Sequence, residues 1–154
     1  GHRADIAGIT ATNDAGERFI QGVSAVRSNA PGDSGVVEPL GMTVHSVGGS
    51  DWFYNSATGF GQVGAAGGTG LNNVGLLVRV FGVVTAVDSS PTPSWFQMDD
   101  GTGRNIRCVA PDSSVVIDAG WVGRLAVVTG ISSLETGAPA SQILLRRYET
   151  PMVF

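Results

Sequence analysis

The strongest constraint on the fold is a glycine that recurs at one position of a repeated segment. Residues 1–10 (GHRADIAGIT) align without gaps with residues 123–132 (GRLAVVTGIS), and residues 75–84 (GLLVRVFGVV) have the same glycine spacing. An interior glycine in a strand-like segment suits a β-bulge, or a sharp bend where a strand curls around a barrel. The sequence therefore predicts three curved strands.

The first and last copies are each followed by a turn and a further strand. Residues 12–16 (TNDAG) lead into a strand over residues 17–26, and residues 135–139 (ETGAP) lead into a strand over residues 142–148. This arrangement predicts a β-hairpin at each end of the chain. The hairpin at residues 1–27 resembles the tail of a domain whose other strands lie outside this sequence.

Residues 28–74 differ in kind, because they are rich in glycine and turn residues and supply no continuous apolar face. We interpret them as a long connector, which in a compact domain is expected to be functional or pinned to a surface. Trp52, Phe53 and Tyr54 are candidates for this pinning by burial against the β domain, and the alternative is that they stack on a ligand.

The rest of the chain, residues 75–154, reads as a small barrel. A chain of 154 residues is long enough to bury a core. We expect strands at residues 75–87, 95–99, 104–109, 121–132 and 142–149, with an irregular or briefly helical piece at 111–120. The predicted organisation is all-β, with a hairpin (1–27), a Gly/Pro-rich connector (28–74) and a five-stranded barrel (75–154).

Three segments in this barrel region, LLVRVFGVVTAVD, WFQMDDGTGRNIRCV and GRLAVVTGIS, resemble the OB-fold family. The resemblance implies a five-stranded Greek-key barrel. The chain is also similar to the repeated OB-like modules of large secreted bacterial proteins, in which a PLGM stretch, a GLNN-GLLVR segment and a DDGTG turn follow one another. Here these segments are residues 39–42, 70–79 and 99–103.

The paired aspartates Asp99 and Asp100 suggest either chemistry or a tight turn. Asp tolerates unusual backbone angles, and Gly101 and Gly103 supply positive φ, so a hairpin turn accounts for all four residues. A calcium site needs more oxygen ligands, and burial strong enough to activate one carboxylate is not favoured beside Arg104. We therefore predict a structural turn.

No other segment carries a recognisable catalytic or metal-binding pattern. His2 and His45 are isolated from cysteines and carboxylates at zinc-ligand spacing. The single cysteine, Cys108, has no partner for an internal disulfide and is expected to be a buried small hydrophobe. We predict a non-enzymatic protein without a cofactor or metal.

Charge weighs against binding to nucleic acid through the phosphate backbone. All nine basic residues are arginine, and the net charge of −4 does not favour binding to a polyanion. No segment has the length of a membrane span, so we also expect no membrane insertion. The OB-fold resemblance nevertheless implies a ligand face for single-stranded nucleic acid or oligosaccharide between loops 88–94 and 134–141. Its residues here are Trp95, Gln97, Arg104 and Arg107. The alternative is that Trp95 is packed and the arginines pair with nearby aspartates.

The hairpin at residues 1–27 copies the fourth and fifth strands of such a barrel without the first three. Its open edges must be covered by the connector or by another copy of the chain, and head-to-tail contacts between copies can build filaments. We expect a structural module of a secreted or cell-surface protein that self-associates through β-strand contacts, as in a fibre subunit. The candidate contact residues are Arg3, Asp5, Phe19, Ile20, Met152, Val153 and Phe154.

Overall fold

A computed structural model of the chain describes residues 4–28, 35, 37–90, 93–136, 140–145 and 151–154. It consists of strands and two short 3-10 helices, which confirms the all-β prediction. The elements are β1 (Ala4–Thr12), β2 (Arg18–Ser28), β3 (Leu40–Gly41), η1 (Val44–Ser46), β4 (Trp52–Asn55), β5 (Phe60–Gln62), β6 (Leu77–Asp88), β7 (Trp95–Asp99), β8 (Ile106–Val109), η2 (Ala119–Trp121), β9 (Leu125–Leu134), β10 (Ser141–Leu145) and β11 (Met152–Val153). No helix in the described part of the chain has the length and apolar character needed to span a bilayer.

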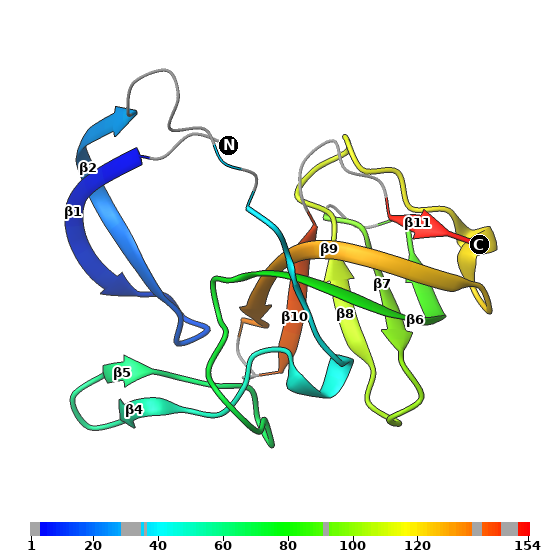
Figure 1. Cartoon of the computed structure of the whole chain (residues 1–154), viewed down its shortest axis with the longest axis horizontal. Coiled ribbons are helices and arrows are strands. Elements are labelled where there is room, and N and C mark those ends of the chain that lie inside the picture. The colour runs from blue at the N-terminus through cyan, green and yellow to red at the C-terminus, as the bar shows by residue number, and fades with distance from the viewer. Residues whose placement is uncertain (1–3, 29–34, 36, 91–92, 137–139, 146–150) are drawn as a thin grey trace.

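Five of the strands close into a barrel. Their order is β6-β7-β8-β10-β9, and β9 pairs back onto β6 (Figure 1). The β8–β10 pair is parallel and the other four pairs are antiparallel. This arrangement is the expected OB-like Greek-key barrel, and the short strands β3 and β11 extend its sheet at the two ends.

The repeated glycine lies where a barrel strand changes its neighbour. Strand β6 pairs with β9 up to Val83 and with β7 from Val83 onward, and a Cβ atom on Gly82 would lie 2.6 Å from the Asp99 carbonyl oxygen. Strand β9 passes from β6 to β10 at Gly130, where a Cβ atom would collide with the Leu144 carbonyl. Both glycines permit a close backbone approach, so the predicted bends are confirmed.

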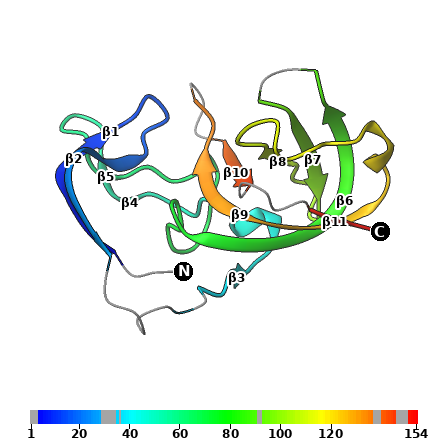
Figure 2. The same ribbon diagram turned by 90° about the horizontal axis from the view of Figure 1, so that it is seen from above.

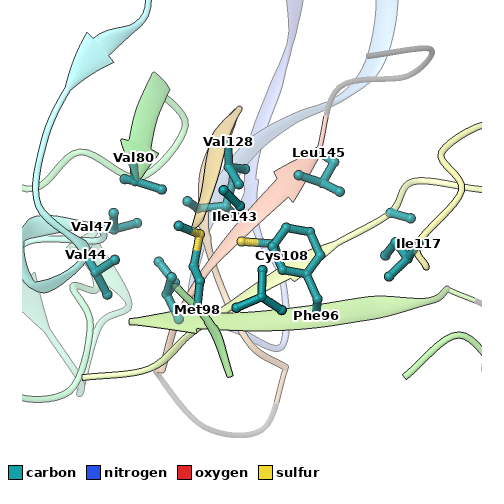
Figure 3. Packing of buried hydrophobic residues seen from close by; sticks show 14 of the residues in the cluster. Val44, Val47, Val80, Phe96, Met98, Cys108, Ile117, Val128, Ile143 and Leu145 are labelled. Atoms are coloured by element: carbon teal, nitrogen blue, oxygen red, sulfur yellow. The ribbon is translucent and has the colours of Figure 1, made fainter. Parts of the chain in front are cut away.

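The barrel interior is filled by alternate residues of each strand (Figure 3). Phe96 and Cys108 are completely buried, and the Trp121 ring packs edge-on against Phe96 with ring centroids 5.6 Å apart. Burial raises the pKa of the Cys108 thiol, which keeps it neutral. Cys108 is therefore the small buried hydrophobe that was expected.

The connector contains more structure than the sequence indicated, namely β3, η1 and the small β4–β5 hairpin. It is pinned to the barrel by Val44 and Val47, both fully buried in the same core as the barrel side chains. The expectation that Trp52, Phe53 and Tyr54 bury against the β domain was wrong. They are 59%, 78% and 37% exposed, because the β4–β5 hairpin that carries them stands away from the barrel.

The N-terminal hairpin also stands apart. Figures 1 and 2 show β1 and β2 as a ribbon on the side of the molecule opposite β11. Within the described residues, its hydrogen bonds to the rest of the chain come from residues 16–18 at its turn end. Among these, the Leu134 amide donates to the Glu17 carboxylate at 2.7 Å. The predicted hairpin is present, and the described residues of the connector leave its Ile9, Phe19 and Ile20 side chains exposed.

Candidate functional site

The Asp99–Asp100 pair forms the turn between β7 and β8. Asp99 Oδ1 accepts bonds from the amides of Gly101 (2.8 Å) and Gly103 (3.2 Å). Both glycines have positive φ, 92° and 76°, which L-residues rarely adopt. The carboxylate of Asp99 is thus used to order its own turn, as predicted.

Asp100 has a second role that the sequence did not indicate. Its Oδ1 accepts the Thr102 hydroxyl at 2.7 Å, and its Oδ2 accepts the Val44 amide at 2.8 Å. Partial burial acts to raise the pKa of Asp100, but the hydrogen bonds from Thr102 and Val44 outweigh it and lower the pKa below its ordinary value. Asp100 therefore stays ionised and ties η1 to the barrel.

The described residues contain no group of three or more His, Cys, Asp or Glu side chains placed to hold a metal ion. His45 lies in η1, where its backbone carbonyl accepts a bond from Arg104 Nη1 at 3.2 Å. His2 lies outside the described residues.

The barrel face implied by the OB resemblance is a groove of about 480 Å³ between strands β7, β8 and β10. The Arg107 guanidinium lies over the Trp95 ring, 4.5 Å from its centroid, and Arg107 Nε lies 3.6 Å from Glu135. The Nε atom is buried and makes no hydrogen bond. The ring and the positive charge that would hold a base thus cover each other, and Glu135 balances the charge.

Gln97 and Arg104, the other two residues of this predicted face, lie in different places. Gln97 is directly opposite Arg107 in the β7–β8 ladder, so the two share the outer face. Arg104 does not join them, because its Nη2 donates to the Ser141 hydroxyl at 3.1 Å and its Nη1 to the connector. The expected pairing of the arginines with aspartates is also absent from the described ion pairs, where Arg107 pairs with Glu135.

The N-terminal hairpin repeats the β9–β10 hairpin in detail. Counted from Gly8 and from Gly130, the register is the same. Thr10 pairs with Ile20 as Ser132 pairs with Ile143, and Ile9 pairs with Gln21 as Ile131 pairs with Leu144. A Cβ atom on Gly8 would approach the Ile20 side chain and the Gln21 carbonyl, and one on Gly130 would approach Ile143 and Leu144 in the same way. The hairpin is a second copy of the barrel's last two strands.

The two copies differ in what covers them. Ile143 is fully buried in the barrel core, whereas Ile20 in the corresponding position is 47% exposed. On the other face of the ribbon, Ile9 and Phe19 are 69% and 43% exposed. Asp5 is exposed on β1 as well, and Arg3 lies outside the described residues. Both faces of the ribbon therefore present apolar side chains to solvent.

A second exposed apolar surface lies at the far end of the molecule, on the outside of β6, β9 and β11. We call it the β11 face. The registers of these strands align two rows of side chains, Phe81–Val127–Met152 and Val83–Leu125–Phe154. Of the tail residues expected to make contacts, Met152 and Phe154 are 54% and 69% exposed, whereas Val153 turns inward and packs against the core. The alternation of residues 79, 81 and 83 along β6 was the available sequence signal for this face.

Comparison with known proteins adds no further assignment. No protein-family model matches the chain, and no curated protein matches it. The barrel topology described above is consistent with an OB-like fold.

Proposed function

We propose that this chain is a non-enzymatic structural module that associates with further copies of itself through the hairpin β1–β2. The observation that carries the proposal is the 47% exposure of Ile20. The corresponding residue of the barrel hairpin β9–β10, Ile143, is completely buried. A two-stranded ribbon alone is marginal in water, and covering one large aliphatic side chain contributes about 1.5–3 kcal/mol. The exposed face of the ribbon therefore favours docking.

The β11 face is the surface that best suits this docking. Strand β11 is at the edge of the barrel sheet, so an added strand can continue the backbone hydrogen bonding. The rows that contain Phe81 and Phe154 supply apolar contacts next to that edge. The ribbon and the β11 face lie at opposite ends of the long axis (Figure 1). Contacts between unlike ends are heterologous, and they build a filament unless they close into a ring.

The setting we propose is a secreted or cell-surface protein. Only 14% of the residues are charged, and the lone cysteine is buried in the core. The PLGM, GLNN-GLLVR and DDGTG segments resemble those of repeated OB modules in large secreted bacterial proteins, which supports the same setting.

The experiment is analytical ultracentrifugation over a range of protein concentrations. The unmodified chain is expected to associate as its concentration rises, and Ile20→Asp is expected to remain monomeric, because a carboxylate on the docking face would lose its hydration. Val116→Asp is the matched control, since Val116 is 71% exposed and lies on neither proposed surface. Association of Ile20→Asp that equals that of the control would contradict the proposal.

A second candidate function is ligand binding in the barrel groove, for single-stranded nucleic acid or oligosaccharide. It is favoured by Trp95 and Gln142, an aromatic and an amide side chain that both line the groove. Glu135 disfavours polyanions there, because it already neutralises Arg107. A fluorescence titration with a pyrimidine oligonucleotide and with a neutral oligosaccharide, each at two salt concentrations, distinguishes these ligands. A quench that is lost in Trp95→Phe would support this function, and no quench by either ligand would remove it.

A further inference from the structure

A concave surface lies outside the barrel, where the turn end of the N-terminal hairpin meets the β4–β5 hairpin. We call it the hairpin cleft. Its volume is about 620 Å³, which is within the range of small-ligand sites. Trp52, Phe60 and Leu71 line it and are 59%, 68% and 88% exposed. Large apolar side chains gathered in a concave surface are typical of a binding site, whereas single exposed ones are not.

The polar wall of the hairpin cleft is held in place by hydrogen bonds. The Gln62 side-chain amide accepts the Arg18 backbone amide at 2.9 Å and donates to the Gly16 carbonyl at 3.2 Å, so it joins the two hairpins. Asn72 Nδ2 donates to the Ser50 carbonyl at 2.9 Å. These bonds order the wall before any ligand arrives, which lowers the entropy cost of binding.

Arg18 is the charged residue of the hairpin cleft. Its Nη1 donates to the Thr12 hydroxyl at 3.0 Å and to the Gly59 carbonyl at 3.2 Å, which holds the guanidinium at the cleft. None of the described lining residues is acidic, and Arg18 makes no ion pair within the described part of the chain. Within the described part of the chain, its Nε and Nη2 make no hydrogen bond, and they can bind a carboxylate, the acceptor that best matches a guanidinium.

The strand that carries Trp52 is irregular at this point. The β4–β5 pairing shifts between Trp52 and Asn55, and Phe53 has a φ of +48°, in a region that non-glycine residues rarely adopt. The Phe53 ring packs edge-on against Trp52 with centroids 5.4 Å apart. A β-bulge redirects side chains, and here the edge-on contact supports the Trp52 ring while leaving it exposed.

We propose that the hairpin cleft binds a saccharide whose pyranose ring carries a carboxylate. The apolar face of the sugar ring would pack on Trp52 and Phe60, and the carboxylate would accept hydrogen bonds from Arg18. Each amide oxygen of Gln62 and Asn72 has a second lone pair that can accept a sugar hydroxyl. This site is separate from the barrel groove and does not depend on self-association.

Isothermal titration calorimetry with trigalacturonate, using maltotriose as the uncharged comparison, tests the proposal. Trigalacturonate is expected to bind with a Kd below about 1 mM, and Arg18→Gln is expected to weaken it about tenfold through loss of a charged hydrogen bond. Trp52→Ala should abolish detectable binding. Equal affinity for maltotriose, or no detectable binding of either sugar, would overturn the proposal.

Control variants locate the site and test whether the protein remains folded. Trp95→Ala removes the tryptophan of the barrel groove and should leave trigalacturonate affinity unchanged, so a loss of binding in this variant would overturn the hairpin cleft as the site. The double variant Phe81→Asp with Phe154→Asp, on the β11 face at the far end of the molecule, should also bind normally, which separates this proposal from self-association. Because Trp52 is 59% exposed, Trp52→Ala should keep the circular dichroism spectrum and thermal midpoint of the unmodified chain. Full binding by the folded Trp52→Ala variant would likewise contradict the proposal.

Discussion

Single side chains decide how the connector is attached to the barrel. Asp100 belongs to the β7–β8 turn and accepts the Val44 amide at 2.8 Å, so a turn residue also holds a segment 56 positions earlier in the chain. In the middle of β9, glycine is required at position 130 because the strand passes too close to β10 for a side chain. Asp100 orders its own turn and Gly130 continues its own strand, and each also lies against a segment that is distant in the sequence. The local sequence pattern does not reveal these long-range approaches.

The Asp100 contact predicts a pH effect. Its pKa is lower in the folded chain than its ordinary value of 3.8, so the ionised form is favoured by folding. The stabilisation is complete above pH 3.8 and is lost as the pH falls below that value through the lowered pKa. Urea unfolding should show that Asp100→Asn costs about 1 kcal/mol at neutral pH. The difference from the unmodified chain should shrink in acid, and a difference that stays constant with pH would contradict this role.

The glycine at position 130 predicts a steric effect. Gly130→Ala would place a Cβ atom against the Leu144 carbonyl and the Ile143 side chain, and relieving such contacts in a packed barrel costs about 1–3 kcal/mol. Gly41→Ala is the control, since a Cβ atom there meets no atom within 4 Å. The free energy of unfolding from urea titration should fall for Gly130→Ala and stay within about 0.5 kcal/mol for Gly41→Ala. Equal effects of the two changes would show that the close approach is unimportant.

At the scale of elements, the part of the connector around η1 packs into the barrel core, whereas the β1–β2 hairpin and the connector's own β4–β5 hairpin stand away from it. Asn73, which is 7% exposed, accepts bonds from the Gly48 amide and the Ser132 hydroxyl, both at 2.8 Å, and donates to the Ser46 carbonyl at 2.7 Å. It thereby joins η1 to β9. Among the described residues, the β1–β2 hairpin is bonded to the barrel only at its turn end, where the Glu17 carboxylate accepts the Leu134 amide at 2.7 Å. Both the β1–β2 and the β4–β5 hairpin expose large apolar side chains.

Removing the Asn73 amide should therefore loosen the connector. Asn73→Ala leaves the Gly48 amide and the Ser132 hydroxyl with fewer partners in a buried site, which costs about 2–3 kcal/mol. Limited proteolysis should cut the connector faster in this variant, and urea unfolding should report the lower stability. Asn55→Ala is the comparison, because Asn55 bonds only within its own exposed hairpin in the described chain, through the Ala57 amide at 2.9 Å. Similar cleavage rates for the two variants would contradict the anchoring role.

At the scale of the whole molecule, the exposed hairpin and the β11 face lie at opposite ends of the long axis (Figure 1). We call the β1–β2 hairpin the donor and the β11 face the acceptor of the proposed contact between copies. One chain would thus carry both surfaces, and its own hairpin could not reach its own β11 face. This placement predicts head-to-tail assembly, in which each interface joins the donor of one chain to the acceptor of the next.

Mixing two blocked variants tests this placement. Ile20→Asp blocks the donor, and the double variant Phe81→Asp with Phe154→Asp blocks the acceptor on the β11 face. Each should be monomeric alone, and an equimolar mixture should form a dimer, because one free donor and one free acceptor remain. Multi-angle light scattering after size exclusion gives the masses. If the acceptor variant still associates alone, the hairpin docks elsewhere, whereas association of the donor variant alone would contradict hairpin docking itself.

The sequence by itself determined the local features of this protein. The all-β class, the barrel strands, the bends at Gly82 and Gly130 and the Asp99–Asp100 turn follow from alternation, glycine spacing and turn chemistry, which act over a few residues. Only the tertiary structure decided which side chains are covered. Arg104 and Arg107 look alike in sequence, yet one is tied to the connector and the other lies over Trp95. Ile20 and Ile143 occupy matching positions, yet only Ile143 is buried. Burial depends on neighbours that are distant in the chain, and no short segment contains that information.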